Sequence, residues 1–196
     1  MTLLTSDGKD SRLTPSWGSH GRFRTMSVQF GGVPKIELIE RVKVVRSLSP
    51  YAESMILHDG FTVLEAPKIA ILADISPADR GFKKPPTTDE LFGVQRLADW
   101  SAENAASLNG YIVDLSPAEV IPPFAIQYKN QPNGEVIWIA MKLIPIQDGG
   151  TGIFVVRCNN EGKLWLYHER DAHPKDRWKL DSHMLYRLSE GSQAPA

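Results

Sequence analysis

The feature that most constrains the fold is the last third of the chain, where short apolar segments alternate with residues that form tight turns. The segments lie at 124–129, 135–146, 153–158 and 164–169, and the turns between them read Gln131-Pro132-Asn133-Gly134, Asp148-Gly149-Gly150 and Asn159-Asn160-Glu161-Gly162. Glycine and asparagine adopt the positive φ angles that tight turns between antiparallel strands require. We therefore predict a meander of antiparallel strands over this region.

Further strands are expected outside the meander. Apolar runs predict them at 68–75, 111–115 and 184–188. A hairpin is predicted at 55–64, with its turn at His58-Asp59-Gly60. Residues 35–47 fit both the strand and the helix period, because apolar side chains recur at both spacings. Their β-branched residues favour a strand.

One long helix is predicted from Thr87 to Leu108. Thr87 and Glu90 fit a capping box, in which the hydroxyl accepts a backbone N–H and the glutamate reaches back to the cap. Apolar residues then recur at helical spacing as far as Leu108, and Asn109-Gly110 supplies a left-handed stop. The apolar face of this helix must pack against a large apolar surface, which the sheet provides.

These elements define an α+β fold. We expect a mainly antiparallel sheet, curved or partly closed, whose C-terminal meander packs against the one long helix. The segments 136–144 and 153–156 are apolar on both faces, so both faces need cover. The helix covers one face, and a second sheet, a closed barrel or a partner chain would cover the other. Self-association through a sheet face is therefore one expectation.

The chain of 196 residues suits one domain. Residues 1–25 are rich in Ser, Thr and Gly, so we expect a flexible tail there, a single α+β domain at 26–189 and a second flexible tail at 190–196. The net charge of −1 argues against a dedicated nucleic-acid-binding protein. A contact with nucleic acid stays open only through the arginines of the N-terminal tail: Arg12, Arg22 and Arg24.

Cys158 is the single cysteine, which excludes an internal disulfide, and we expect it to be a buried hydrophobic residue. The longest apolar stretch, 136–146, is interrupted by Lys142 and is too short to cross a bilayer. The first residues lack the apolar core of a signal peptide. We therefore expect a cytoplasmic protein without membrane association.

The preferred functional hypothesis is a non-catalytic protein that binds another macromolecule, most simply a protein, without a cofactor. No phosphate-binding glycine loop and no nucleophile elbow is present in the sequence. Trp178 lies in a polar loop and would contact the partner together with Arg170, Lys175 and Arg177. In the alternative interpretation, Trp178 anchors this loop against the sheet.

A second hypothesis is a metal-assisted hydrolase. Imidazole and carboxylate groups, the ligands that zinc and manganese prefer, gather in the segment 168–183: His168, Glu169, Asp171, His173 and His183. Their spacing does not match the His-Glu-x-x-His motif of a zinc helix. The alternating charges of the segment are also typical of a solvated loop.

A third hypothesis is a carrier of a small ligand. In this case the sheet would close into a barrel around a cavity, and Trp138, Phe154 and Trp165 would line it. No motif in the chain is specific enough to name a family.

Overall fold

The structure, a computed structural model, describes residues 17–170 and 175–190. Within these residues, one mixed and mostly antiparallel sheet of ten strands combines with five short α-helices. The α+β class and the mostly antiparallel sheet are therefore confirmed. The sheet is not closed, however, and none of the described helices is long. No described helix combines the length and the apolar character needed to span a membrane.

The elements have the following bounds. The strands are β1 (Gly18–His20), β2 (Phe23–Phe30), β3 (Ser47–Leu48), β4 (Lys68–Asp74), β5 (Tyr111–Asp114), β6 (Val136–Ile139), β7 (Ile144–Pro145), β8 (Thr151–Cys158), β9 (Leu164–Arg170) and β10 (His183–Glu190). The helices are α1 (Lys35–Val45), α2 (Pro50–Leu57), α3 (Thr88–Phe92), α4 (Val94–Glu103) and α5 (Ile121–Gln127), with a short 3₁₀ turn, η1 (Ala118–Val120), before α5.

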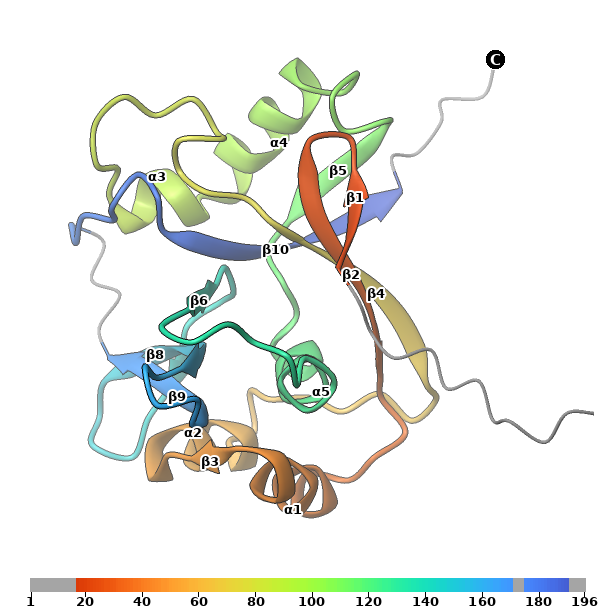
Figure 1. The fold of residues 1–196 in the computed structure, drawn as a ribbon, viewed down its shortest axis with the longest axis vertical. Coiled ribbons are helices and arrows are strands. Elements are labelled where there is room, and N and C mark those ends of the chain that lie inside the picture. Colours follow the sequence, from red (N-terminus) through yellow and green to blue (C-terminus); the bar gives the residue numbers. More distant parts are fainter. Residues whose placement is uncertain (1–16, 171–174, 191–196) are drawn as a thin grey trace, which may run out of the picture.

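The last strand, β10, lies in the middle of the sheet. The strand order is β1-β2-β4-β10-β6-β8-β9-β3, with β5 paired to β10 and β7 paired to β8. Among the strand pairs that the structure describes, only β10–β6 and β3–β9 are parallel. Figure 1 shows β10 crossing the molecule between the long β2–β4 arm and the β6–β8–β9 group. The C-terminal strand thus joins the N-terminal half of the sheet to the meander.

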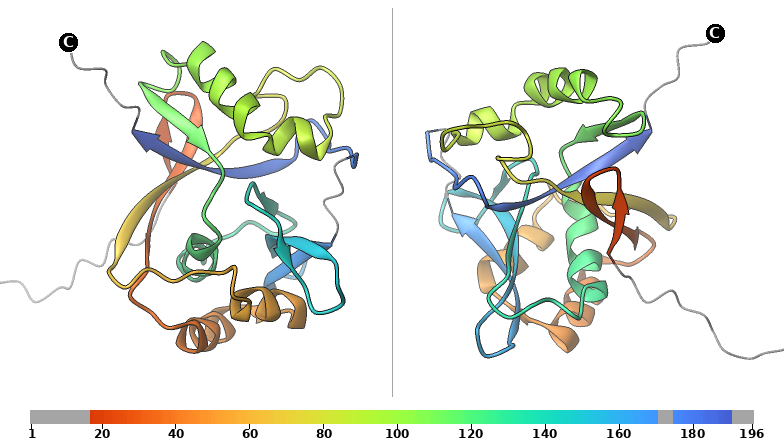
Figure 2. Two further views of the ribbon diagram at one scale, coloured as in Figure 1. Left: turned by 180° about the vertical axis from the view of Figure 1, so that it is seen from behind. Right: turned by 45° about the horizontal axis from the view of Figure 1, so that its top comes forward.

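The helices lie at two ends of the sheet. Helices α3 and α4 pack near β5 and β10, whereas α1 and α2 lie at the opposite end, next to β3 and β9 (Figures 1 and 2). Helix α5 contacts both α1 and β2. Residues Ile153–Val156 of β8 are completely buried within the single chain, and Phe154 meets the edge of Phe61. The chain itself therefore covers both faces of β8.

Three segments predicted as strands are helices. In α1, Leu38, Ile39 and Val42 are buried at helical spacing, so burial of one helix face outweighs the β-branched preference. The predicted hairpin at 55–64 is wrong, because α2 occupies its first half and begins at Ser49, whose side chain accepts a hydrogen bond from the Ala52 amide. The first meander segment, 124–129, belongs mostly to α5.

Helix α5 contains two prolines, although proline in the interior of a helix usually breaks it. Pro122 and Pro123 lie in the first turn of α5, where a missing N–H costs no helical hydrogen bond. Proline is therefore compatible with a helix here because of its position within that helix.

The predicted long helix is divided in two at Gly93. The capping box at its start is confirmed, because the Thr87 hydroxyl accepts from the Glu90 amide and the Glu90 carboxylate accepts from the Thr87 amide. Gly93 then adopts an extended conformation, with φ of −62° and ψ of 116°. Asn109 and Gly110 have the positive φ angles that were expected. The residues between Asn104 and Asn109 form turns and not a continued helix.

The ordered sheet begins before Met26. Residues 18–20 and 23–25 pair as a hairpin, and β2 continues as the partner of β4 through Phe30. At the other end, β10 continues to Glu190. Of the expected N-terminal tail, the part beyond residue 17 therefore belongs to the sheet, and residues 1–16 lie outside the described residues.

Candidate functional site

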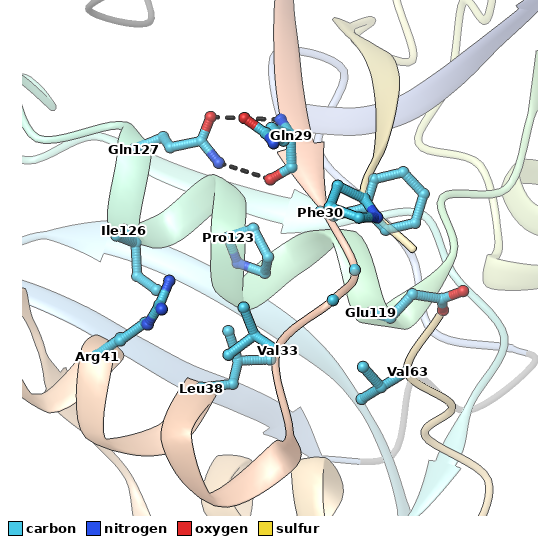
Figure 3. A pocket seen from close by; sticks show the side chains of 13 residues that line it. Gln29, Phe30, Val33, Leu38, Arg41, Val63, Glu119, Pro123, Ile126 and Gln127 are labelled. Carbon is cyan, nitrogen blue, oxygen red and sulfur yellow. Dashed lines mark hydrogen bonds between the residues drawn. The ribbon is translucent and has the colours of Figure 1, made fainter. Parts of the chain in front are cut away.

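A pocket of about 350 Å³ lies between the end of β2, α1 and α5; we name it the β2–α5 pocket. Its lining is mainly apolar and comes from five separate segments of the chain: Phe30, Val33, Leu38, Val63, Pro67, Pro123 and Ile126. Figure 3 shows Val33, Leu38, Pro123 and Ile126, which come from the segment after β2, from α1 and from α5, around the same space. The pocket therefore exists only because the tertiary fold brings distant segments together.

The wall after β2 is formed by a pair of glycines. Gly31 and Gly32 have φ angles of +86° and +71°, and a Cβ on Gly31 would lie 2.7 Å from the Ala66 carbonyl oxygen. The Gly32 amide donates a hydrogen bond to the Leu64 carbonyl at 2.7 Å. Glycine is required at this turn because the backbone is left-handed and approaches the neighbouring loop closely.

The opposite wall is held by the side chain of Gln127. Strand β1 pairs with residues 23–25 of β2, and no other described strand lies beside the later part of this edge. The Gln127 side-chain amide fills this place: its Nε2 donates to the Gln29 carbonyl at 2.9 Å, and its Oε1 accepts from the Gln29 amide at 3.4 Å (Figure 3). This pair of hydrogen bonds fixes α5 to β2 and places Pro123 and Ile126 in the pocket wall.

Two charged residues lie at opposite sides of the pocket. Figure 3 shows Arg41 on one side and Glu119 on the other, with Val33 and Pro123 between them. The Arg41 guanidinium is already paired with Glu37, at 2.6 Å. Among the residues that the structure describes, Glu119 has neither a hydrogen-bond partner nor an ion-pair partner. The pocket therefore presents an uncompensated carboxylate.

A second polar group of side chains lies where the ends of four strands meet; we name it the strand-end cluster. It consists of Arg24, Asp74, Tyr128, Glu135 and His183. The Arg24 guanidinium contacts both Asp74 and Glu135 at 2.8 Å, and the side chains of these two acids are only 7% and 8% exposed. His183 Nδ1 lies 2.8 Å from Asp74 Oδ2, and the Tyr128 hydroxyl donates to Glu135 at 2.8 Å.

The environment of the strand-end cluster shifts the pKa values of three of its members, Arg24, Tyr128 and His183. The hydrogen bond to Asp74 raises the pKa of His183, although partial burial opposes this effect. Burial raises the pKa of Tyr128 to about 12, and the neighbouring Glu135 carboxylate also acts in this direction. His183 therefore retains a proton at higher pH than an isolated histidine, and Tyr128 stays a neutral donor.

The loop residues predicted to bind a partner are divided by the structure. Trp178 is buried, its Nε1 donates to Thr88 Oγ1 at 3.0 Å, and its ring meets the edge of Trp138. Trp178 therefore anchors its loop against Thr88 of α3 and Trp138 of β6. Lys175 and Arg177 are exposed, and Arg177 donates to the Pro85 carbonyl. Arg170 ends β9, and its side chain is outside the described part of the structure.

The residues of the metal hypothesis are not brought together where the structure describes them. His168 and Glu169 belong to β9, whereas His183 begins β10, and β6 and β8 lie between these strands. His168 packs against the Tyr51 ring, and burial raises the pKa of Glu169. Asp171 and His173 lie outside the described residues. Among the described side chains, no group of three or more could hold a metal ion.

The residues proposed to line a barrel cavity do not line the β2–α5 pocket. Phe154 is fully buried in the core, Trp138 packs against Trp178, and Trp165 lies beneath the Lys163 ammonium at 4.5 Å. The sequence interpretation also missed the strand-end cluster. The sequence gives only a weak signal of this cluster. Asp74 and Glu135 lie at the ends of apolar segments, and a charged residue in such a position often marks the end of a strand and faces solvent.

Comparison of the chain with protein-family models, with curated proteins and with solved structures gives no match. What the protein does must therefore be inferred from the geometry of its own sites.

Proposed function

We propose that this protein binds a small, mainly apolar molecule that carries an amine, in the β2–α5 pocket. The observation that carries the proposal is the pocket itself, whose volume is about 350 Å³ and whose walls are mainly apolar. Ligand sites in proteins typically have volumes of about 300–1,000 Å³ and combine apolar walls with a few placed polar groups.

The charges of the pocket favour an amine over a carboxylate. The Arg41 guanidinium is paired with Glu37, which reduces its attraction for an incoming anion. Glu119 has no partner within the described residues and would pair with a cation at the pocket rim. A half-buried carboxylate in a mainly apolar site interacts with a cation more strongly than it would in water.

The walls of the pocket are held before any ligand arrives. The glycine turn is tied to the Leu64 carbonyl, and α5 is tied to Gln29 by its side-chain amide. A preformed site reduces the conformational entropy that is lost on binding. This rigidity favours a specific ligand site over a gap between loosely packed elements.

Two probes of similar size and opposite charge test the proposal. We expect 2-phenylethylamine to bind saturably, with a Kd in about the millimolar range for so small a molecule. We expect 3-phenylpropionate to bind at least about threefold more weakly, because Glu119 repels its carboxylate. Titration of backbone amide shifts in NMR spectra measures both affinities and locates the site.

Three variants assign the binding to the pocket. Val63→Phe should fill the pocket and abolish binding, whereas Ile36→Phe changes an exposed residue of the same neighbourhood outside the lining and should leave the Kd unchanged. Glu119→Gln should remove the preference for the amine. Equal binding by the wild type and Val63→Phe, or no saturable binding of either probe, would contradict the proposal.

Binding of a macromolecule by the 168–183 segment stays a prediction. Burial of Trp178 withdraws the aromatic residue that this hypothesis placed on the surface. The exposed charges of Lys175 and Arg177 are the remaining described features on which it depends. The pocket is the better supported site because its shape and charge together specify a class of ligand.

A further inference from the structure

The strand-end cluster lies apart from the β2–α5 pocket. Arg24 is directly opposite Asp74 in the β2–β4 ladder, whereas the pocket begins at Gln29. The five residue-to-residue steps from Arg24 to Gln29 extend about 17 Å along a strand. His183 at the start of β10 and Glu135 just before β6 join this end, because these two strands run parallel. His183 and Asp74 therefore lie away from the pocket, whereas Tyr128 of the cluster directly follows Gln127 of the pocket lining.

His183 is oriented by a buried carboxylate. Its Nδ1 contacts Asp74 Oδ2 at 2.8 Å, and the side chains of the two residues are 48% and 7% exposed. Within the described residues no hydrogen bond involves His183 Nε2. An aspartate that binds Nδ1–H leaves the lone pair of the neutral ring on Nε2. The exposed side of the imidazole is thus a base, supported from behind by a carboxylate.

Arg24 occupies the position between the two acids that a metal ion would need. It donates to Asp74 and Glu135 at once, so both carboxylates can be buried as anions. All three donors to Asp74 use Oδ2, and Oδ1 is buried without a partner among the described residues. A buried acceptor of this kind is uncommon where a group serves packing alone.

We propose that His183 and Asp74 form a general base pair for hydrolysis of a neutral acyl ester. His183 Nε2 takes a proton from water as the water oxygen forms a bond to the acyl carbon. When the bond from this carbon to the leaving oxygen breaks, the imidazolium returns the proton to that oxygen. Asp74 is a positioning residue that holds the ring and stabilises the imidazolium.

The charge of the cluster selects the substrate class. The charged groups that face His183 are Asp74 of β4, Arg24 of β2 and Glu135 before β6. With neutral His183 this set carries two negative charges and one positive charge. The excess negative charge disfavours phosphate esters and other anions, whereas a neutral ester pays no such electrostatic cost.

Hydrolysis of two chromogenic probes tests the proposal on the full chain. We expect p-nitrophenyl acetate to be hydrolysed at least about tenfold faster by the wild type than by His183→Gln, and bis(p-nitrophenyl) phosphate to show no such difference. His58→Gln is the matched control, because the Nδ1 of this half-buried histidine accepts from the Gly60 amide and contacts no carboxylate. It should retain the wild-type rate.

The pH profile separates positioning by Asp74 from a general effect on structure. Asp74→Asn should lower both the NMR titration midpoint of His183 and the inflection of the rate profile, whereas Asp74→Glu should restore part of both. If these variants do not fold, the wild type alone decides, since the titration midpoint of His183 must lie above the ordinary histidine value of 6.5. The proposal is overturned if His183→Gln keeps the wild-type rate, or if the titration midpoint of His183 lies at or below the ordinary histidine value of 6.5.

Discussion

At the scale of single residues, buried Arg46 shows how one side chain joins distant segments. It is 4% exposed and donates to the carbonyl oxygens of Ala125 and Tyr128 at the end of α5 and to the Gln131 side chain at 2.8 Å. Burial lowers the pKa of Arg46 to about 10, so the group stays charged near neutral pH. The guanidinium satisfies carbonyls that a helix end leaves unpaired.

We expect Arg46→Met to lower the free energy of unfolding by about 3 kcal/mol, because it leaves two buried carbonyl oxygens and an amide without their donor. Urea denaturation measures the change. Arg41→Met removes an exposed arginine of α1, the helix that ends directly before Arg46, and should cost less than about 1 kcal/mol. Equal losses in the two variants would show that Arg46 does not stabilise the end of α5.

His183 should make the stability of the protein depend on pH. Its pKa in the folded state is raised above the ordinary value of 6.5, so the folded state binds the proton more tightly than the unfolded state. The resulting stabilisation is complete below about pH 6.5 and is lost as the pH rises through the raised folded-state pKa. We therefore expect the wild type to lose more stability than His183→Gln between these limits.

Urea denaturation of both proteins, at one pH on each side of this window, measures the difference. An identical pH dependence in His183→Gln and the wild type would show that the bond to Asp74 does not shift the titration of His183.

At the scale of elements, the Gln127 side chain pairs with the β2 backbone at Gln29, where no described strand lies beside this edge. We expect Gln127→Ala to accelerate hydrogen exchange of the Gln29 amide and to cost about 1 kcal/mol of stability, because two hydrogen bonds to the Gln29 backbone are lost. Exchange followed by NMR measures the rate. Gln95→Ala, at an exposed amide of α4, should leave the Gln29 rate unchanged. Unaltered exchange in Gln127→Ala would contradict this role.

Local signals predicted some elements and not others. Strands β4, β8, β9 and β10 follow their apolar runs, and Gly134, Gly149 and Gly162 have the positive φ angles expected at the turns. The capping box at Thr87 is also as predicted. These features depend on a few neighbouring residues. The helix α1 was missed because its residues satisfy two periods, and only burial of Leu38, Ile39 and Val42 decides between them.

At the scale of the whole molecule, the decisive feature is the position of β10 between β4 and β6. The strand pairs antiparallel with β4 and parallel with β6, although these partners are distant in the chain. No local pattern encodes such a register, because pairing depends on the competition among all strands. This placement brings His183 to Asp74 and Arg24 and thereby creates the strand-end cluster.

Which segments cover the two faces of β8 was also decided at this scale. Its apolar pattern showed that both faces of β8 must be buried, and both are. The pattern did not show which segments would cover them, and the chain supplies the cover without the closed barrel or partner that the sequence interpretation considered. The sequence interpretation placed a cavity inside a barrel, whereas the pocket in the structure lies between β2, α1 and α5.

By itself, the sequence determined the α+β class, the turns of the C-terminal strands and the start of the helix at Thr87, because these depend on side-chain period and on the φ preferences of single residues. The tertiary structure alone decided the helices α1, α2 and α5, the strand order and both candidate sites. The pocket and the cluster each join residues from several distant segments, and their chemistry arises from proximity that no local pattern records.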